Sequence, residues 1–258
     1  MTRAIDWLNR TVRRGLGRPV EGTPAAGWKR LLVLANSTRA GGHCIAGREV
    51  VGPGHPLGPW LRPVGRTGTD ALRAGEWLYR SGRPVGVLDV ADVYLTGPAA
   101  APGQPENWRV GRRRPWAPAR PAVTRPDLRS LEEHPADLWV EPGNRTDRVT
   151  AGRLAARPPG PSLAIVRPAG FRVVLSTESA TGRPRPRRRC RFSYRGAPYD
   201  LGLTDPVLIA RTAGECPGRL PAEVRLPGGD DLLVCVSLAG DYHGHHYKVV
   251  AAVFEGVT

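Results

Sequence analysis

The sequence predicts a mainly β protein with two β-barrels joined by an irregular connection that is rich in proline and arginine and carries a short helix. Apolar runs in the chain are short, and most are bounded by glycine or proline. The 27 prolines argue against long helices, because helix interiors do not tolerate proline. At 258 residues the chain can form two small domains, each with its own core. We therefore expect helix only at the N-terminus and in the connection.

The N-terminal extension, residues 1–27, begins with a pattern typical of a short amphipathic helix over 3–16. The apolar positions at helical spacing are Ile5, Leu8, Val12 and Leu16. Residues 17–27 then contain the glycines and prolines of a linker. Packing of this helix against the body is the plain expectation.

Three further segments follow in order. Residues 28–100 form the predicted first barrel, with β runs at 30–35, 44–51, 59–64, 76–80 and 85–95. Residues 101–160 form the predicted irregular connection, with a helical turn that starts near Asp127. Residues 161–258 form the predicted second barrel, with runs at 163–168, 171–179, 189–196, 198–210, 231–240 and 246–255.

The stretch 31–50 places polar and reactive side chains between two strand-like runs. The side chains in question are Asn36, Ser37, Thr38, Arg39, His43 and Cys44. Gly41 and Gly42 give the backbone freedom to turn tightly or to approach a ligand. A polar hairpin turn explains the same residues without a ligand, so both interpretations stay open.

Several separated motifs give the chain a family resemblance. They are ANSTRAGGHCIAG at 35–47, PWLRPVG at 59–65, FSYRGAPYDLGLTDP at 192–206, VCVSL at 234–238 and HYKVVAAVF at 246–254. In these motifs the chain resembles the dual OB-containing domain of bacterial proteins, many of them predicted components of prokaryotic conflict or immunity systems. The resemblance implies two OB-like barrels and a nucleic-acid role. It implies no known reaction.

The charge of the chain favours an anionic partner. The formal net charge is +15 and the pI is about 10.9, which makes RNA or single-stranded DNA the default candidate. Nearly all of the positive charge is arginine, since Lys29 and Lys248 are the only lysines. Abundant Ala, Gly, Pro and Arg are also what a GC-rich genome produces, so charge alone does not establish binding.

Aromatic and basic residues alternate in the way a single-strand groove requires, because bases stack on aromatic faces. Trp108 and Trp116 lie in polar, irregular sequence and are the predicted stacking residues, whereas Trp60 and Trp77 lie in apolar runs and are predicted core residues. The predicted phosphate contacts nearby are Arg112, Arg113 and Arg114.

The segment 183–191 holds six arginines and two prolines. We expect a mobile loop between two strands, in which Arg187, Arg188 and Arg189 contact phosphates without reading bases. A solvated loop without a ligand is the alternative.

Two chemical sites deserve a test. His243, His245 and Asp241 share a segment, but a further strong ligand is not evident, so we expect a turn that bears histidines and no metal. Cys44 is a candidate nucleophile. His43 is its neighbour and points to the opposite face of a strand, so a base would have to come from elsewhere. A small buried thiol is the alternative.

The remaining expectations concern compartment and partners. Cys44, Cys190, Cys216 and Cys235 include no CxxC pair, which argues against a zinc ribbon and for reduced thiols in a cytoplasm. No apolar run is long enough to span a bilayer. We expect no cofactor and no membrane association.

The favoured surface joins Asn36, Ser37, Arg39, His43 and Cys44 to Arg62 and to the turn that carries His245 and Lys248. We expect a nucleic-acid-binding module, single-strand or end recognising, in a conflict or nucleic-acid-processing system. The alternatives are an enzyme acting on nucleotides or nucleic acid through Cys44 or the histidines, and an adaptor for a protein encoded in the same operon.

Overall fold

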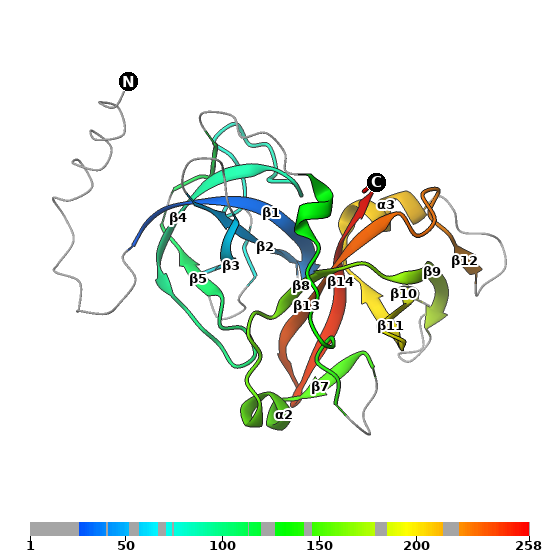
Figure 1. Ribbon diagram of the computed structural model, residues 1–258. Helices are drawn as coiled ribbons and strands as arrows, with labels where there is room; N and C mark the ends of the chain where they lie inside the picture. The colour runs from blue at the N-terminus through cyan, green and yellow to red at the C-terminus, as the bar shows by residue number, and fades with distance from the viewer. Residues whose placement is uncertain are drawn as a thin grey trace, which may run out of the picture.

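Two β units lie side by side in the computed structural model, with β8, β13 and β14 between the strands of the first unit and the remaining strands of the second (Figure 1). The structure describes residues 26–39, 41–51, 57–66, 71–73, 75–112, 114–119, 127–141, 146–178, 185–213 and 222–257. The predicted helix over 3–16 lies outside these residues. The mainly β fold class with two barrel-like units is confirmed.

The first unit is a closed barrel. Its strands are β1 (Gly27–Arg39), β2 (Gly42–Val50), β3 (Leu57–Val64), β4 (Val90–Pro98), β5 (Asn107–Val110) and β6 (Ala117–Pro118). They follow the order β1-β2-β3-β5-β4, and β4 returns to pair with β1, while β3 and β5 run parallel. Where β2 pairs with β1, a Cβ on Gly47 would lie 1.9 Å from the carbonyl oxygen of Leu32, so only glycine fits at this position.

The second unit repeats this order. Its strands are β7 (Arg148–Thr150), β8 (Leu163–Val166), β9 (Ala169–Glu178), β10 (Arg185–Tyr194), β11 (Ala197–Leu203), β12 (Ala222–Val224), β13 (Leu232–Tyr242) and β14 (His245–Glu255). The central path is β9-β10-β11-β14-β13, with β11 parallel to β14. The sheet curls around one core, and we call this unit the second barrel.

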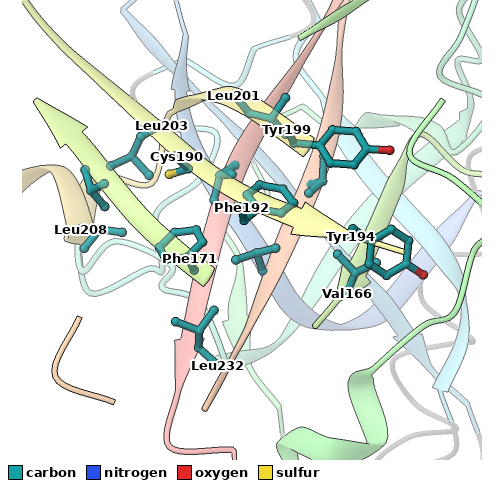
Figure 2. Packing of buried hydrophobic residues seen from close by; sticks show 14 of the residues in the cluster. Val166, Phe171, Cys190, Phe192, Tyr194, Tyr199, Leu201, Leu203, Leu208 and Leu232 are labelled. Atoms are coloured by element: carbon teal, nitrogen blue, oxygen red, sulfur yellow. The ribbon is translucent and has the colours of Figure 1, made fainter. Parts of the chain in front are cut away.

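Aromatic residues fill the core of the second barrel (Figure 2). The rings of Phe192 and Tyr199 stack with their centroids 5.5 Å apart, and Phe171 lies 6.1 Å from Phe192. Cys190 and Leu201 are fully buried beside them. Since residues 190 and 192 of β10 point inward, residues 187, 189 and 191 point outward.

A separate apolar cluster joins the two units. The side chains of Leu32 and Leu34 project from the outer side of the first barrel into this cluster, whereas those of Leu31 and Val33 point into the barrel interior. On the other side, Leu233 and Cys235 of β13 project into the same cluster. The apolar runs in β1 and β13 are continuous because both faces of each strand are buried.

The barrel boundaries differ from the predicted ones. β5 and β6 complete the first barrel after residue 100. β7 pairs with β14, and the helix α2 (Ala151–Ala156) follows it directly, so the second barrel begins before residue 161. The segment 101–160 is therefore largely built into the two barrels. The run 76–80 forms only isolated bridges.

The helices are partly where the sequence predicted them. The 3-10 helix η1 (Leu128–Leu131) starts after Asp127, whose carboxylate accepts from the Arg129 amide at 3.0 Å. The prediction that helix occurs only at the N-terminus and in the connection is wrong, because α3 (Pro206–Ala213) lies within the second barrel. Asp205 begins α3 by accepting from the amides of Val207 and Leu208, as a strand-ending turn requires.

Candidate nucleic-acid interface

A buried polar network between the barrels holds Arg62. Its Nε donates to Glu106 at 3.0 Å, and its Nη2 donates to Ser162 at 2.6 Å and to Ser237 at 3.1 Å. Arg62 is 6% exposed and Glu106 is 7% exposed. The predicted contact of Arg62 with nucleic acid is therefore corrected: this guanidinium ties the first barrel to the second.

The outer side of β2 and β3 is covered in the same way. Ala46 and Trp60 pack into the cluster shared by the two barrels, and Trp60 is 5% exposed. Its Nε1 donates to Glu133 at 3.0 Å, which Arg48 also contacts at 2.7 Å. The prediction of Trp60 as a core residue is confirmed, and the core is the one between the barrels.

Asn36 and His43 form a fixed pair at one end of the first barrel. Asn36 is buried, and its Nδ2 donates to the carbonyl oxygen of Val85 at 2.9 Å. Its Oδ1 therefore faces His43 Nδ1 at 2.7 Å and accepts a hydrogen bond from the N–H of this nitrogen, since an amide oxygen cannot donate. The His43 ring also stacks on Trp77 at 3.7 Å, and partial burial lowers the pKa of His43. The amide of Asn36 is thus occupied within the protein, which corrects its prediction as an exposed recognition group.

The other residues of this segment are dispersed. Ser37 is 8% exposed, so it too offers little surface, and the side chain of Arg39 lies outside the described residues. Cys44 is half-buried and follows His43 on β2, so the two side chains point to opposite faces, as predicted. Burial raises the pKa of the Cys190 and Cys235 thiols.

The residues around 108–116 divide between core and surface. Trp116 is 1% exposed and donates to the carbonyl oxygen of Glu76 at 2.8 Å, so its prediction as a stacking residue is wrong. Trp108 is partly buried, with Lys29 Nζ 5.5 Å from its ring centroid. Arg114 lies over the Tyr94 ring at 4.5 Å, and Arg112 is exposed. Arg113 lies outside the described residues.

The described part of the arginine run, residues 185–191, forms a strand where a loop was predicted. Residues 185–191 belong to β10, and Arg187 and Arg189 share its outward side with Arg191. Arg188 alternates to the other side, which corrects its placement with the phosphate contacts. Arg189 pairs with Asp147 at 3.1 Å and with Asp200, so it ties β10 to β11 and to the residue that precedes β7.

A row of charges crosses the outward side of this sheet. Arg191 lies directly opposite Arg172 on β9 and Asp200 on β11. We define the second-barrel face by its outward residues Arg172, Arg187, Arg189, Arg191 and Asp200. The side chains of Arg172 and Arg191 are 37% and 44% exposed, so both are accessible.

The turn between β13 and β14 carries a cluster of exposed rings. His243 and Gly244 occupy its central positions with φ of 53° and 77°, as a two-residue hairpin turn requires. Tyr242 is 61% exposed, and its ring lies 4.4 Å from His243 and 6.3 Å from Tyr247. His245 lies 6.4 Å from Tyr247. The prediction of a histidine-bearing turn is confirmed.

Lys248 lies inside the second barrel rather than on its surface. It is 1% exposed, and its Nζ lies 5.7 Å from the centroid of the Tyr199 ring. Burial lowers the pKa of Lys248 to about 8, although the negative charges of Asp137, Asp147 and Glu141 act in the opposite direction and raise it. The predicted contact of Lys248 with nucleic acid is corrected, because its ammonium group cannot reach a bound strand.

A comparison of the chain with protein-family models identifies the family to which it belongs. The family model for the dual OB-containing domain, DuOB, matches residues 29–253 and thus covers both barrels. This chain belongs to the dual OB-containing domain family. No curated protein and no solved structure matches it.

The dual OB-containing domain here has two unequal barrels. OB-folds bind oligonucleotides on the face of their second and third strands and through the loops after the first and fourth strands. In the first barrel those strands are β2 and β3, whose outer side is buried. In the second barrel they are β10 and β11, and the loop after the fourth strand is the turn at 242–245. The accessible face of the domain therefore carries arginines and an aromatic turn.

Sequence reasoning missed four residues of this face. Arg172 and Arg191 alternate with apolar residues in β9 and β10, and this alternation could have placed them outward. Tyr242 and Tyr247 flank the predicted histidine turn and went unnoticed beside the histidines. The favoured surface also divides, since His43 contacts Asn36 and Trp77 whereas His245 contacts Tyr247 on the β13–β14 turn.

Within the ranges that the structure describes, no three His, Cys, Asp or Glu side chains gather as a metal site would need. None of the helices in these ranges is long and apolar enough to cross a membrane.

Proposed function

We propose that this protein binds single-stranded nucleic acid on the second-barrel face and the turn between β13 and β14. The observation that carries the proposal is the combination of the accessible arginines Arg172 and Arg191, on the outward side of β9 and β10, with exposed rings on the adjoining turn. A groove for single strands needs both, since cations attract the phosphates and aromatic faces stack the bases.

The exposed ion pairs of this face can exchange with phosphate. Arg191 contacts Asp200 at 3.0 Å, and Arg172 contacts Glu223 at 3.2 Å. Ion pairs this exposed contribute only about 0–1 kcal/mol to stability. The phosphates of a bound nucleic-acid strand can therefore replace the carboxylates as partners of the arginines. Arg189 is different, because its side chain is 14% exposed and locked between carboxylates. On β10 the proposed contacts with the nucleic-acid strand are Arg191 and its outward neighbour Arg187, and Arg189 supports them.

The ring cluster supplies the second requirement. Tyr242 is exposed, and Tyr247 is held by a hydrogen bond of 3.4 Å that its hydroxyl accepts from Arg148. β7, which carries Arg148, pairs with β14 beside the arginine-bearing strands. A nucleic-acid strand bound across β10 and extending to the turn would therefore contact the rings of Tyr242 and Tyr247. The proposed setting is the conflict or nucleic-acid-processing system that the family resemblance implies.

Replacing Arg187 and Arg191 by Ser should weaken binding and flatten its salt dependence. Each lost phosphate contact reduces the log-log slope of affinity against salt by about 0.7, so the double variant should lose roughly 1.4. The measurement is fluorescence anisotropy of thymidine and uridine oligonucleotides over a salt series. Arg73→Ser with Arg80→Ser removes two exposed arginines of the first barrel and is the matched control. An equal change in both double variants would reduce the binding to a general charge effect.

Replacing Tyr242 by Ala should weaken binding without affecting the fold, because this side chain is 61% exposed. Loss of one stacked base costs about 1–3 kcal/mol, which corresponds to roughly 5-fold to 150-fold in affinity. Trp28→Ala, at a ring 40% exposed on the first barrel, is the control and should leave affinity unchanged. The reverse result, with Trp28 sensitive and Tyr242 insensitive, would move the binding surface to the first barrel.

A further inference from the structure

Two arginines stand directly opposite each other on the second-barrel face. Arg172 on β9 and Arg191 on β10 are paired across the strands, and like charges in such positions repel. Glu223 reduces this repulsion from β12, at 3.2 Å from Arg172 and 4.0 Å from Arg191. Asp200 approaches Arg191 from the other side at 3.0 Å. All four side chains are 37–51% exposed, so water and anions reach the guanidinium groups.

A hollow of about 440 Å³ opens beside this arginine pair. Arg172 and Arg191 line it together with Thr146 and Ser193. Gly170 also lines it, and so do residues 191–193, where the register of β9 and β10 shifts. The volume falls within the range of about 300–1,000 Å³ that small-ligand sites occupy, and it greatly exceeds what a lone phosphate needs.

We propose that this hollow seats one nucleotide unit, with its phosphate on Arg172 and Arg191. Two neighbouring guanidinium groups present the paired donors that phosphate oxygens accept. The phosphate takes the place of the Glu223 carboxylate, and Thr146 and Ser193, which line the hollow, are the polar residues next to the sugar and base. Asp200, at the edge of the hollow, is an acceptor for the amino group of a base.

This inference rests on the proposed function and makes it more specific. Binding of a strand by Arg187, Arg191 and Tyr242 requires no defined subsite, whereas a nucleotide seat predicts that a single nucleotide binds by itself. It also gives Arg172 a defined role, as a contact to the phosphate of a single nucleotide.

The test is calorimetric titration of the full-length protein with AMP, dAMP and inorganic phosphate. AMP or dAMP should bind at least roughly tenfold more tightly than phosphate, and Arg172→Ser should reduce that affinity by on the order of tenfold. Glu223→Gln removes the competing carboxylate and should increase the affinity. Arg80→Ser is the control on the first barrel.

The outcomes separate the two proposals. If neither nucleotide binds at millimolar concentration, or if phosphate binds as tightly as AMP, the nucleotide seat is overturned. Should oligonucleotide binding then still depend on Arg187 and Tyr242, the proposed function stands without it. If AMP binds and Arg172→Ser abolishes this, while oligonucleotides do not bind, the seat is supported and the strand-binding function falls.

Discussion

Replacing Arg62 by Ala should reduce the free energy of unfolding by about 3–5 kcal/mol, as expected when one partner of a buried ion pair is removed. The Glu106 carboxylate would stay buried at 7% exposure, and among the residues that the structure describes Ser162 would be its remaining donor. Urea denaturation followed by tryptophan fluorescence measures the change. Since Arg62 bridges the barrels, the variant should also unfold less cooperatively.

Two comparisons make the Arg62 result specific. Arg48→Ala removes a more exposed arginine, 25% exposed and 2.7 Å from Glu133, and should cost about 1 kcal/mol or less. The double change Arg62→Met with Glu106→Leu removes both charges and should recover most of the lost stability. If Arg62→Ala costs no more than Arg48→Ala, the network does not hold the barrels together.

Replacing Lys248 by Met should stabilise the protein near neutral pH by up to about 3 kcal/mol. Burial lowers the pKa of Lys248 to about 8 in the folded chain, from the ordinary lysine value of 10.5. This difference corresponds to about 3 kcal/mol, because one pKa unit is worth about 1.4 kcal/mol. Met fills similar volume and carries no charge to bury.

The pH dependence of the Lys248 effect has a definite sign. Below pH 8 this lysine is protonated in both states, and the folded chain bears the full cost of the buried ammonium. Between pH 8 and 10.5 the unfolded chain binds more protons at this site than the folded chain does. The free energy of unfolding of the wild-type protein therefore increases with pH in this range. The advantage of Lys248→Met should therefore shrink from pH 7 to pH 10 in urea titrations.

Lys29 provides the control, since it is the other lysine and has a carboxylate partner in Glu49 at 2.9 Å. Lys29→Met should not stabilise the protein. An advantage of Lys248→Met that is equal at pH 7 and pH 10 would mean that hydrophobic packing, not charge burial, produces it.

Local patterns predicted the parts of the fold that depend on neighbouring residues. The alternation within β2 predicted that His43 and Cys44 face opposite ways. The turn at Asp205 is of the same local kind, because its side chain accepts from the amides two and three residues on. The histidine turn followed from the same local chemistry. These features depend on contacts within a few residues, which a single sequence displays.

Burial between distant segments was not predictable in this way. Trp116 lies in proline-rich sequence that looks exposed, yet the segment around Glu76 covers it. Arg62 resembled a surface cation because its partners are far along the chain, at Glu106, Ser162 and Ser237. Lys248 sits in an alternating strand whose charged residue happens to face inward. In each case the packing of two barrels against each other, or of a loop over a barrel, decides exposure.

The same reasoning explains why the arginine run was expected to be a loop. Its prolines and charges are typical of irregular sequence. In the structure, Cys190 and Phe192 anchor the strand in the core, and the carboxylates of Asp147 and Asp200 pair with Arg189. Tertiary contacts thus override the local preference of residues 185–191.

The central claim is that the second barrel, and not the covered strands of the first, contacts nucleic acid. Hydrogen–deuterium exchange of the full chain with and without a saturating single-stranded oligonucleotide tests it most directly. We predict slower exchange in β10 and β11 and at the 242–248 turn, with β2 and β3 unchanged. Protection confined to β2 and β3, with none in β10 or the turn, would contradict the claim, because it would require the strand to enter the interface that Arg62 and Trp60 now fill.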